Sequence, residues 1–211
     1  MDAQVVDENG KPLGAGEKGF LIIKHPWPGQ FITLWEDKAR FESVYFSRFK
    51  GMYYAADYAM KDSDGYFWLL GRADEVLKIA GHRIGTIEIE DTLIMHQSVA
   101  ESAVIGKSDG IKGETPVAFV ILRPGNSPTP ALRKELMDYV RNYIGPIAVP
   151  SSLYFVDRLP KTRSGKIMRR VIRAVVEEKT LGDVSTLEDS ASVDEANRAY
   201  NELKDQISKA T

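Results

Sequence analysis

The sequence predicts an α+β protein built from two parts that differ in secondary structure. Residues 1–72 carry strand and turn signals with one short helix, whereas residues 73–180 alternate strands with helices. Residues 181–211 form a tail with an apolar stripe at helical spacing. With 43% hydrophobic and 27% charged residues among 211, the chain has an ordinary globular composition and is long enough for two small cores.

The composition excludes several classes of function. Without cysteine, the chain has no disulfide, cysteine nucleophile or cysteine-based metal site. The histidines, His25, His82 and His96, lie far apart and show no zinc-ligand spacing, so we expect no metal site. No apolar run approaches the roughly 20 residues that cross a bilayer, and no signal-peptide pattern is present. We therefore expect a cytoplasmic protein without a membrane partner, and a net charge of −2 gives no reason to expect nucleic acid.

The first part is expected to be mainly β-structure. Residues 19–23 form a short apolar strand, and residues 53–60 and 66–70 read as two strands joined by a turn at Asp62–Gly65. A short helix is expected at 37–46. Few helices are available to cover these strands, so their edges and aromatic side chains would need further partners.

The second part begins with a strand at 75–80 and a glycine-bounded loop at 81–85. Thr86 can cap a helix that runs to about His96. On that helix the side chains expected to be buried are Ile87, Leu93 and Ile94.

The rest of the second part completes a compact α+β domain. Thr129-Pro130 is a strong helix start, because a capping hydroxyl precedes proline at the first helical position. That helix stops at Gly145-Pro146. The other elements expected are strands at 99–105, 116–122 and 152–156 and a basic-then-acidic helix at 166–178.

The tail is expected to end in an amphipathic helix. Its apolar stripe repeats with spacings of three and four, through Val193, Ala196, Tyr200, Leu203 and Ile207. One interpretation is a helix packed on its own domain. The other is a contact with another subunit or with a domain outside the chain.

A basic segment is the most informative local feature. Between residues 158 and 173 lie seven basic side chains: Arg158, Lys161, Arg163, Lys166, Arg169, Arg170 and Arg173. They suit a solvated face or a nucleic-acid patch, although no aromatic residues for base stacking are interleaved within 161–173. A third interpretation is that Ser164-Gly165 makes a tight turn that projects Lys166 into a cleft. There one ammonium could meet a carboxylate and a phosphate together.

The run LPKTRSGKIMRR at residues 159–170 resembles the last core motif of the adenylate-forming enzymes, in the form typical of AMP-forming acetyl-CoA synthetases. The resemblance implies that Lys166 contacts the carboxylate substrate and the nucleotide during adenylation. It also implies that Lys166 is a site of reversible acylation, which would remove its charge.

A second run, GRADEVLKIAGHRIG at residues 71–85, resembles the hinge motif of the same enzymes. The resemblance makes Asp74 the hinge about which the small domain rotates between half-reactions. It implies that Arg72 and Arg83 meet ribose and α-phosphate oxygens. Gly81 would lie where the pantetheine of CoA approaches. Without the family, the same run would be a strand, a turn and two exposed arginines.

Two shorter matches extend the resemblance. In Tyr53–Asp57 the family places an aspartate that accepts hydrogen bonds from both ribose hydroxyls, which implies this role for Asp57. The two residues before it are alanines where the family has Thr-Gly or Ser-Gly, and Ala80 replaces a common serine before Gly81. Arg141 matches an arginine that approaches the CoA phosphates, although a solvated helix residue is an equal alternative.

The resemblance implies the domain organisation. Residues 1–72 would be the end of the large AMP-binding domain, as an incomplete fragment of its β-barrel, and residues 73–180 the mobile carboxy-terminal domain, followed by the tail at 181–211. The family's phosphate loop, acyl pocket and adenine site lie in the large amino-terminal domain and have no match here. The chain is therefore expected to be inactive alone, with that domain as its partner in cis or in trans.

The resemblance also implies the reaction. Acetate and ATP, with Mg²⁺, would give acetyl-AMP and pyrophosphate, and CoA would then take the acetyl group. Propionate remains an alternative substrate. Two other functions stay open: a non-catalytic module that binds nucleotide or CoA, and one half of a split synthetase that acts in trans.

Overall fold

The structure is a computed structural model that describes residues 1–209, and for residues 199 and 202–209 it describes the backbone alone. The chain divides into two compact units, Met1–Val76 and Leu77–Thr211. This division falls a few residues after the boundary predicted at 72/73. The assignment of the first part to a larger domain stays a prediction.

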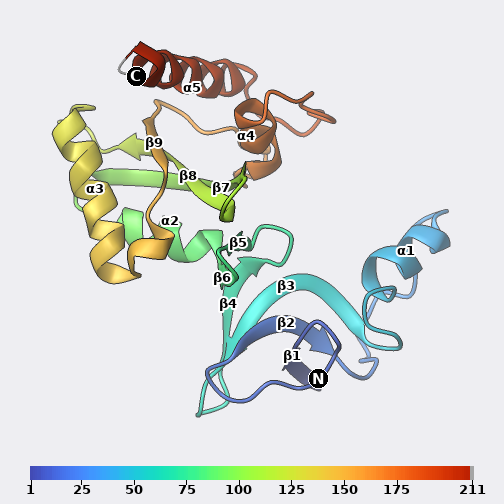
Figure 1. The fold of residues 1–211 in the computed structure, drawn as a ribbon. Coiled ribbons are helices and arrows are strands. Elements are labelled where there is room, and N and C mark those ends of the chain that lie inside the picture. Colours follow the sequence, from blue (N-terminus) through green and yellow to red (C-terminus); the bar gives the residue numbers. More distant parts are fainter. Residues whose placement is uncertain (210–211) are drawn as a thin grey trace. The chain divides into compact units, whose positions relative to one another are not determined.

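The first unit is built on a four-stranded antiparallel sheet, as its strand signals indicate (Figure 1). The strands lie in chain order: β1 (Ala3–Val6), β2 (Lys18–Ile23), β3 (Tyr53–Lys61) and β4 (Phe67–Arg72). The predicted turn between β3 and β4 is present, with the Asp62 carboxylate accepting hydrogen bonds from the N–H groups of Asp64 and Tyr66 at 3.0 and 2.8 Å. Asp37 caps helix α1 (Lys38–Tyr45) through the N–H of Arg40 at 2.9 Å, which confirms the predicted helix.

The second unit is a layered α+β structure, as predicted (Figure 1). Its sheet contains β5 (Leu77–Ile79), β6 (His82–Ile84), β7 (Val99–Asp109), β8 (Gly113–Leu122) and β9 (Ser152–Phe155). The order is β6-β5-β8-β7, and β9 pairs in parallel with β8. Strands β7 and β8 form a hairpin that is longer than the two separate strands expected from the apolar runs.

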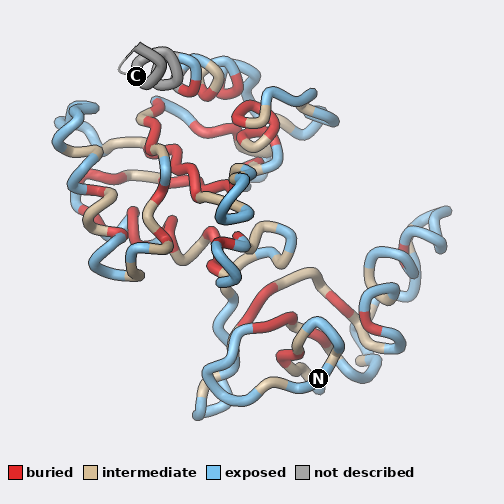
Figure 2. Tube along the Cα trace, in the orientation of Figure 1, coloured by how far each residue is buried: buried red, intermediate tan, exposed pale blue. Residues whose placement is uncertain are grey.

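Helices cover both faces of this sheet because successive strand residues point to opposite sides. On β8, Phe119 packs with helices α4 (Arg169–Val176) and α5 (Ala191–Lys209), whereas Val120 packs with α2 (Thr86–Met95) and α3 (Pro130–Tyr143). A short 3₁₀ helix, η1 (Pro146–Ala148), follows α3. Figure 2 shows the strands between these helices as the most buried part of this unit.

The loop predicted at 81–85 contains a strand. His82–Ile84 pairs with β5 through a two-residue turn whose central residues, Ala80 and Gly81, have φ of +48° and +85°. Positive φ at both positions is the signature of a type I′ turn, which matches the twist of a hairpin. A three-residue strand is too short to display a period of two in the sequence, so the prediction as a loop was wrong.

Helix α2 also differs from its prediction. Gly85, not Thr86, precedes the first helical turn. The Glu88 carboxylate accepts a hydrogen bond from the backbone N–H of Gly85 at 3.0 Å. Ile89 and Leu93 are buried, whereas Ile94 is 38% exposed. Glu90 faces the interior together with Ile89 and Leu93, and Ile94 is partly exposed in the last turn of the helix.

The final predicted helix begins three residues late, because Lys166 belongs to a hairpin. Lys161 pairs with Ile167, and the N–H of Thr162 donates to the carbonyl of Lys166 at 2.8 Å. Helix α4 starts at Arg169, after this pairing has ended.

The tail helix packs on its own unit at the positions that are described. Val193, Ala196 and Tyr200 are buried in the core that α4 and the sheet form, which confirms that interpretation for these residues. The predicted stripe continues to Leu203 and Ile207, which lie outside the described side chains. Within residues 1–209, none of the helices has the length and apolar content needed to cross a bilayer.

A buried ion pair joins α2 to the start of α4. Two oxygens of Glu90 accept hydrogen bonds from the Arg169 guanidinium at 2.8 and 2.6 Å, and one also accepts the backbone N–H of Val104 in β7 at 2.7 Å. The side chains are only 6% and 18% exposed, so each charge depends on the other. Three elements are therefore tied together at one carboxylate.

We expect Glu90→Ala to lower the free energy of unfolding of the second unit by about 3 kcal/mol, because the Arg169 guanidinium would lose the carboxylate that neutralises its charge in a mostly buried site. Circular dichroism during urea unfolding measures this, since α2 to α5 all belong to this unit. The double variant Glu90→Met, Arg169→Met is the control. It removes both charges and should be less destabilising than the single variant; an equal or larger loss would contradict the explanation from the buried charge.

Candidate functional site

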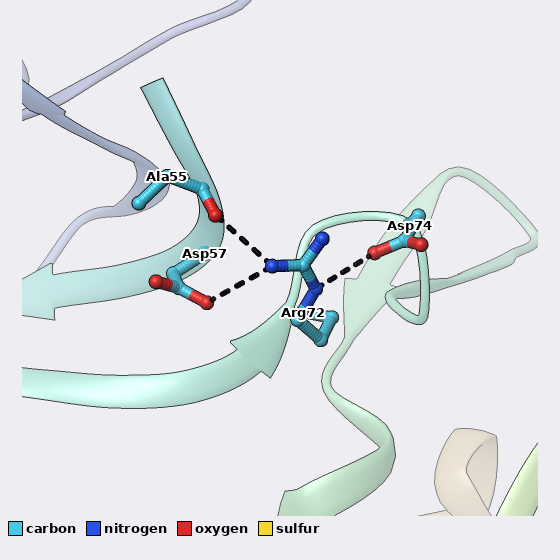
Figure 3. Close-up of polar contacts among 4 residues, drawn as sticks. All are labelled: Ala55, Asp57, Arg72 and Asp74. Carbon is cyan, nitrogen blue, oxygen red and sulfur yellow. Dashed lines mark hydrogen bonds and ion pairs between the residues drawn. The ribbon is translucent and has the colours of Figure 1, made fainter. Parts of the chain in front are cut away.

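Asp57 and Arg72 are direct cross-strand neighbours in the first unit. Asp57 on β3 is paired in register with Arg72, the last residue of β4. Nη1 of Arg72 lies 3.8 Å from an Asp57 carboxylate oxygen and donates a hydrogen bond to the Ala55 carbonyl at 3.0 Å. The guanidinium therefore sits against the strand that carries Asp57 (Figure 3).

The same guanidinium reaches the segment after β4. Its Nε donates to a carboxylate oxygen of Asp74 at 3.3 Å, and Asp74 itself is 72% exposed (Figure 3). The N–H of Ala73 donates to the carbonyl of Ala56 at 2.8 Å. Arg72 thus links β3 to the residues that lead out of the sheet, and three of the predicted site residues come together within one unit.

The Asp57 carboxyl lies in a mixed electrostatic environment. Burial raises its pKa, the Arg72 guanidinium lowers the pKa, and the Asp74 carboxylate raises it, with burial the largest effect. The net result is a pKa above the ordinary value of an aspartate. Its side chain is still one-third exposed (33%), so the carboxylate is accessible to a ligand.

Two of the three alanines that depart from the family pattern, Ala56 and Ala80, occupy unusual backbone positions. Ala56 has φ of +63° and Ala80 has φ of +48°, and few non-glycine residues adopt this region. Ala56 stands where the family has glycine, which adopts positive φ without strain. Ala56 thus adopts, directly before Asp57, a backbone conformation that favours glycine.

Lys166 lies on an exposed hairpin in the second unit. Gly165, with φ of +81°, makes the tight turn that the sequence predicts, and its N–H donates to the Thr162 carbonyl at 2.8 Å. The Thr162 hydroxyl accepts the N–H of Lys166 at 3.1 Å. Among the described residues, the Lys166 ammonium has no hydrogen-bond or ion-pair partner, so its charge is available.

Most of the other basic side chains near Lys166 are already engaged. Lys161 pairs with Glu101 on β7 at 2.6 Å, and Arg158 pairs with Asp189 at 2.5 Å. Arg169 is held by Glu90, and Arg170 donates to two backbone carbonyls. This pattern disfavours the nucleic-acid patch, because four of the seven charges serve internal contacts.

The remaining predicted residues are placed apart from the hairpin. Gly81 occupies the exposed turn between β5 and β6, and no atom lies within 4 Å of the Cβ it would carry as an alanine. Arg83 is the middle residue of β6, opposite Lys78. Arg141 lies in the last turn of α3, 54% exposed and 3.8 Å from Asp138. Within the described residues, no hydrogen bond or ion pair joins Arg141 to Lys166.

Sequence reasoning missed the contacts that hold the hairpin. Glu90 and Glu101 are each one acidic residue among many, and nothing in their spacing predicts an arginine or lysine partner. Nothing in the sequence predicts a contact between residues 182–187 of the tail and the hairpin. In the structure, Thr162 pairs with Leu187, which places this segment beside the hairpin.

Among the described side chains, no group of three or more histidine, aspartate or glutamate residues is arranged to hold a metal ion.

Sequence comparisons relate this chain to known proteins. The family described as AMP-binding enzyme C-terminal domain matches residues 88–166, ending at Lys166. An acetyl-coenzyme A synthetase of Pyrobaculum aerophilum is 58% identical over 209 residues, which cover 99% of this chain and 31% of that protein. A 3-hydroxypropionyl-coenzyme A synthetase of Metallosphaera sedula is 49% identical over 206 residues, covering 97% of this chain and 31% of that protein.

The fold is also found in solved structures. An acetoacetyl-CoA synthetase from Streptomyces lividans matches with a TM-score of 0.82 over 97% of this chain and 31% of that one, at 24% identity, which shows the fold alone. The chain belongs to the adenylate-forming enzymes and contains their AMP-binding carboxy-terminal domain. Within that family it is similar, along almost its whole length, to the carboxy-terminal part of acetyl-coenzyme A synthetases. It spans about a third of the length of these relatives.

Two substitutions beside Asp57 should shift the pKa of its carboxyl in opposite directions. We expect Arg72→Ala to raise the pKa of the Asp57 carboxyl further, because a nearby positive charge is removed. Asp74→Asn should lower the same pKa, because a nearby negative charge is removed. Carboxyl-carbon NMR titration measures both. Asp62, whose pKa is lowered mainly by its hydrogen bond from Trp68, is the internal control and should not move.

The positive φ of Ala56 should lower the stability of the first unit, and a substitution can test this. Ala56→Gly should raise the free energy of unfolding of the first unit by about 0.5 to 1 kcal/mol, since relief of left-handed strain exceeds the extra entropy of glycine. Trp27, Trp35 and Trp68 are the only tryptophans, and all lie in this unit, so fluorescence reports its unfolding. Ala55→Gly, without positive φ, should be destabilising instead; stabilisation by both variants would contradict the strain argument.

Proposed function

We propose that this chain is the carboxy-terminal portion of an AMP-forming acetyl-CoA synthetase. The observation that carries the proposal is an exposed lysine, Lys166, without a partner among the described residues, at the tip of a hairpin whose base is fixed by ion pairs. The whole protein would join acetate to ATP, with Mg²⁺, to give acetyl-AMP and pyrophosphate. CoA would then displace AMP to give acetyl-CoA.

In the first half-reaction, an acetate oxygen attacks the α-phosphorus of ATP and pyrophosphate leaves. Negative charge develops at the phosphate oxygens as the two anions meet. We assign Lys166 the role of neutralising this charge, which a compact ammonium with three donors can do for carboxylate and phosphate together. Acylation of Lys166 would remove the charge, and is therefore proposed as a means of switching the step off.

Three residues are proposed to bind the nucleotide. Asp57 is proposed to accept hydrogen bonds from the two ribose hydroxyls, which suits its partly exposed carboxylate. Arg72 and Arg83 are proposed to meet ribose and α-phosphate oxygens, where a planar fork of donors is effective. The present contacts of Arg72 with Asp57 and Ala55 support this role, because they hold the guanidinium beside the proposed ribose ligand.

The second half-reaction would use a different set of residues. The CoA thiol attacks the acetyl carbon, the thiol proton is released, and AMP leaves. Gly81 is proposed to allow the pantetheine to approach, since open space surrounds its Cα, and Arg141 to meet CoA phosphates. Asp74 is proposed as the hinge between the half-reactions; it is exposed and precedes the division between the compact units by two residues.

The acyl substrate is proposed to be acetate. The higher identity to an acetyl-CoA synthetase, 58% against 49% for a 3-hydroxypropionyl-CoA synthetase, supports this choice. Because the chain is also similar to a 3-hydroxypropionyl-CoA synthetase, a larger acyl substrate such as propionate or a hydroxy acid is the alternative. We also propose a cytoplasmic location, where ATP and CoA are both available.

The partner of this chain is proposed to be an amino-terminal domain, in cis or in trans, that supplies the adenine site and acyl pocket. ATP–pyrophosphate exchange with acetate distinguishes the alternatives. We expect no exchange by the 211-residue chain alone and exchange when the amino-terminal domain is present. Exchange by the chain alone would overturn the division of roles, and CoA or AMP binding without turnover in any mixture would favour a non-catalytic module.

We expect Lys166→Ala, in the protein that includes the amino-terminal domain, to lower ATP–pyrophosphate exchange by about 100- to 1000-fold, the typical loss on removing one charge-stabilising group. Transfer of acetyl from supplied acetyl-AMP to CoA should be retained. Lys179→Ala is the matched control, because Lys179 is an exposed lysine that pairs only with Glu177 nearby. Undiminished exchange in the Lys166 variant would refute the role assigned to this lysine.

A further inference from the structure

Residues 186–188, within the segment 181–189, pair with the first arm of the Lys166 hairpin. The N–H of Arg163 donates to the Thr186 carbonyl at 3.1 Å, and the N–H of Glu188 donates to the Lys161 carbonyl at 2.9 Å. Between these bonds, Thr162 pairs with Leu187. The arm that leads to Lys166 therefore has a paired segment on each side: residues 166–168 on one and residues 186–188 on the other.

The segment is itself anchored to the domain. Leu181 and Leu187 pack against the core that α4 and the sheet share. The Arg170 guanidinium donates to the carbonyls of Leu181 and Asp183. At the far end, Asp189 pairs with Arg158 at 2.5 Å. A two-stranded hairpin alone is marginal in water, so a third segment fixed to the core restricts its motion.

The other edge and the base of the hairpin are held as well. Lys161 contacts both oxygens of Glu101 on β7, at 2.8 and 2.6 Å, and Met168 donates its N–H to the Pro160 carbonyl at 2.8 Å. By contrast, residues 163–166 at the tip are exposed. The structure thus fixes the hairpin at its base and leaves Lys166 to project.

We propose that residues 181–189 form a brace that positions Lys166 for adenylation, an inference that rests on the function proposed above. The ammonium must meet a carboxylate and a phosphate at hydrogen-bond distance, and a catalytic group needs its geometry held within about 0.5 Å by surrounding contacts. The brace supplies two backbone hydrogen bonds to the arm that precedes Lys166. It lies outside the matched family region, which ends at Lys166.

The test uses a pair of substitutions at one position. Glu188→Pro removes the N–H that bonds to the Lys161 carbonyl, whereas Glu188→Gln keeps it and removes only the side-chain charge. In the 211-residue chain, hydrogen exchange measured by mass spectrometry should be faster for peptides covering 159–168 in the proline variant alone. Peptides from β7 and β8 should be unchanged. Equal exchange in both variants would overturn the brace.

The catalytic consequence is tested in the protein with its amino-terminal domain. Glu188→Pro should lower ATP–pyrophosphate exchange by about 10- to 100-fold, as expected for a catalytic group misplaced by roughly 1 Å. Transfer from supplied acetyl-AMP to CoA should remain at the Glu188→Gln level. A role in folding alone would reduce both half-reactions together, and that result would overturn the positioning role.

Two further variants keep the outcomes separable. If Glu188→Pro does not fold, Arg170→Gln loosens the segment without changing the hairpin and should show the same selective loss. Lys166→Ala is assayed in parallel. If it leaves exchange intact, the proposed function fails and the positioning role fails with it. If it abolishes exchange while the brace variants do not, the brace alone is overturned.

Discussion

A carboxylate in the interior of the second unit requires a cation beside it, and the arrangement around Lys166 depends on how Glu90 meets this requirement. Arg169 supplies the charge through two hydrogen bonds, and Val104 adds a backbone donor. Because these partners belong to α2, α4 and β7, the carboxylate fixes the start of α4. The second arm of the hairpin ends only one residue before Arg169, so its base is placed by the same interaction.

The first unit uses an arginine in a different way. Arg72 pairs with two acidic residues, Asp57 and Asp74. Its side chain is 49% exposed, and its ion pair with Asp57 spans 3.8 Å. Such contacts are weaker and more easily exchanged than those of a buried pair. In the function proposed above, a guanidinium that is held loosely between Asp57 and Asp74 would exchange partners when a nucleotide arrives or when the backbone near Asp74 changes. The buried Glu90–Arg169 pair is suited to holding its elements rigidly, whereas the exposed pairs of Arg72 are suited to exchanging partners.

In the basic segment, the tertiary structure decides which of the positive charges take part in internal contacts. Seven positive charges within sixteen residues suggest a diffuse electrostatic surface. Acidic side chains and backbone carbonyls on other elements engage four of them, among them Lys161 and Arg169. What is left at the hairpin tip is Lys166 with its neighbour Arg163. The proposed chemistry therefore rests on one positioned ammonium rather than on the total charge.

The sequence by itself determined the elements that depend on local signals. The α1 and α3 helices follow from the caps Asp37 and Thr129, the β3–β4 turn from Asp62–Gly65, and the tight turn before Lys166 from Gly165, because each depends on residues within a few positions. The family membership followed from the motif that contains that turn. Only the tertiary structure decided which way α2 faces, that residues 82–84 form a strand, and which acids hold the lysine hairpin. These features join residues distant in the chain, and a carboxylate carries no local signal of the partner that will neutralise it.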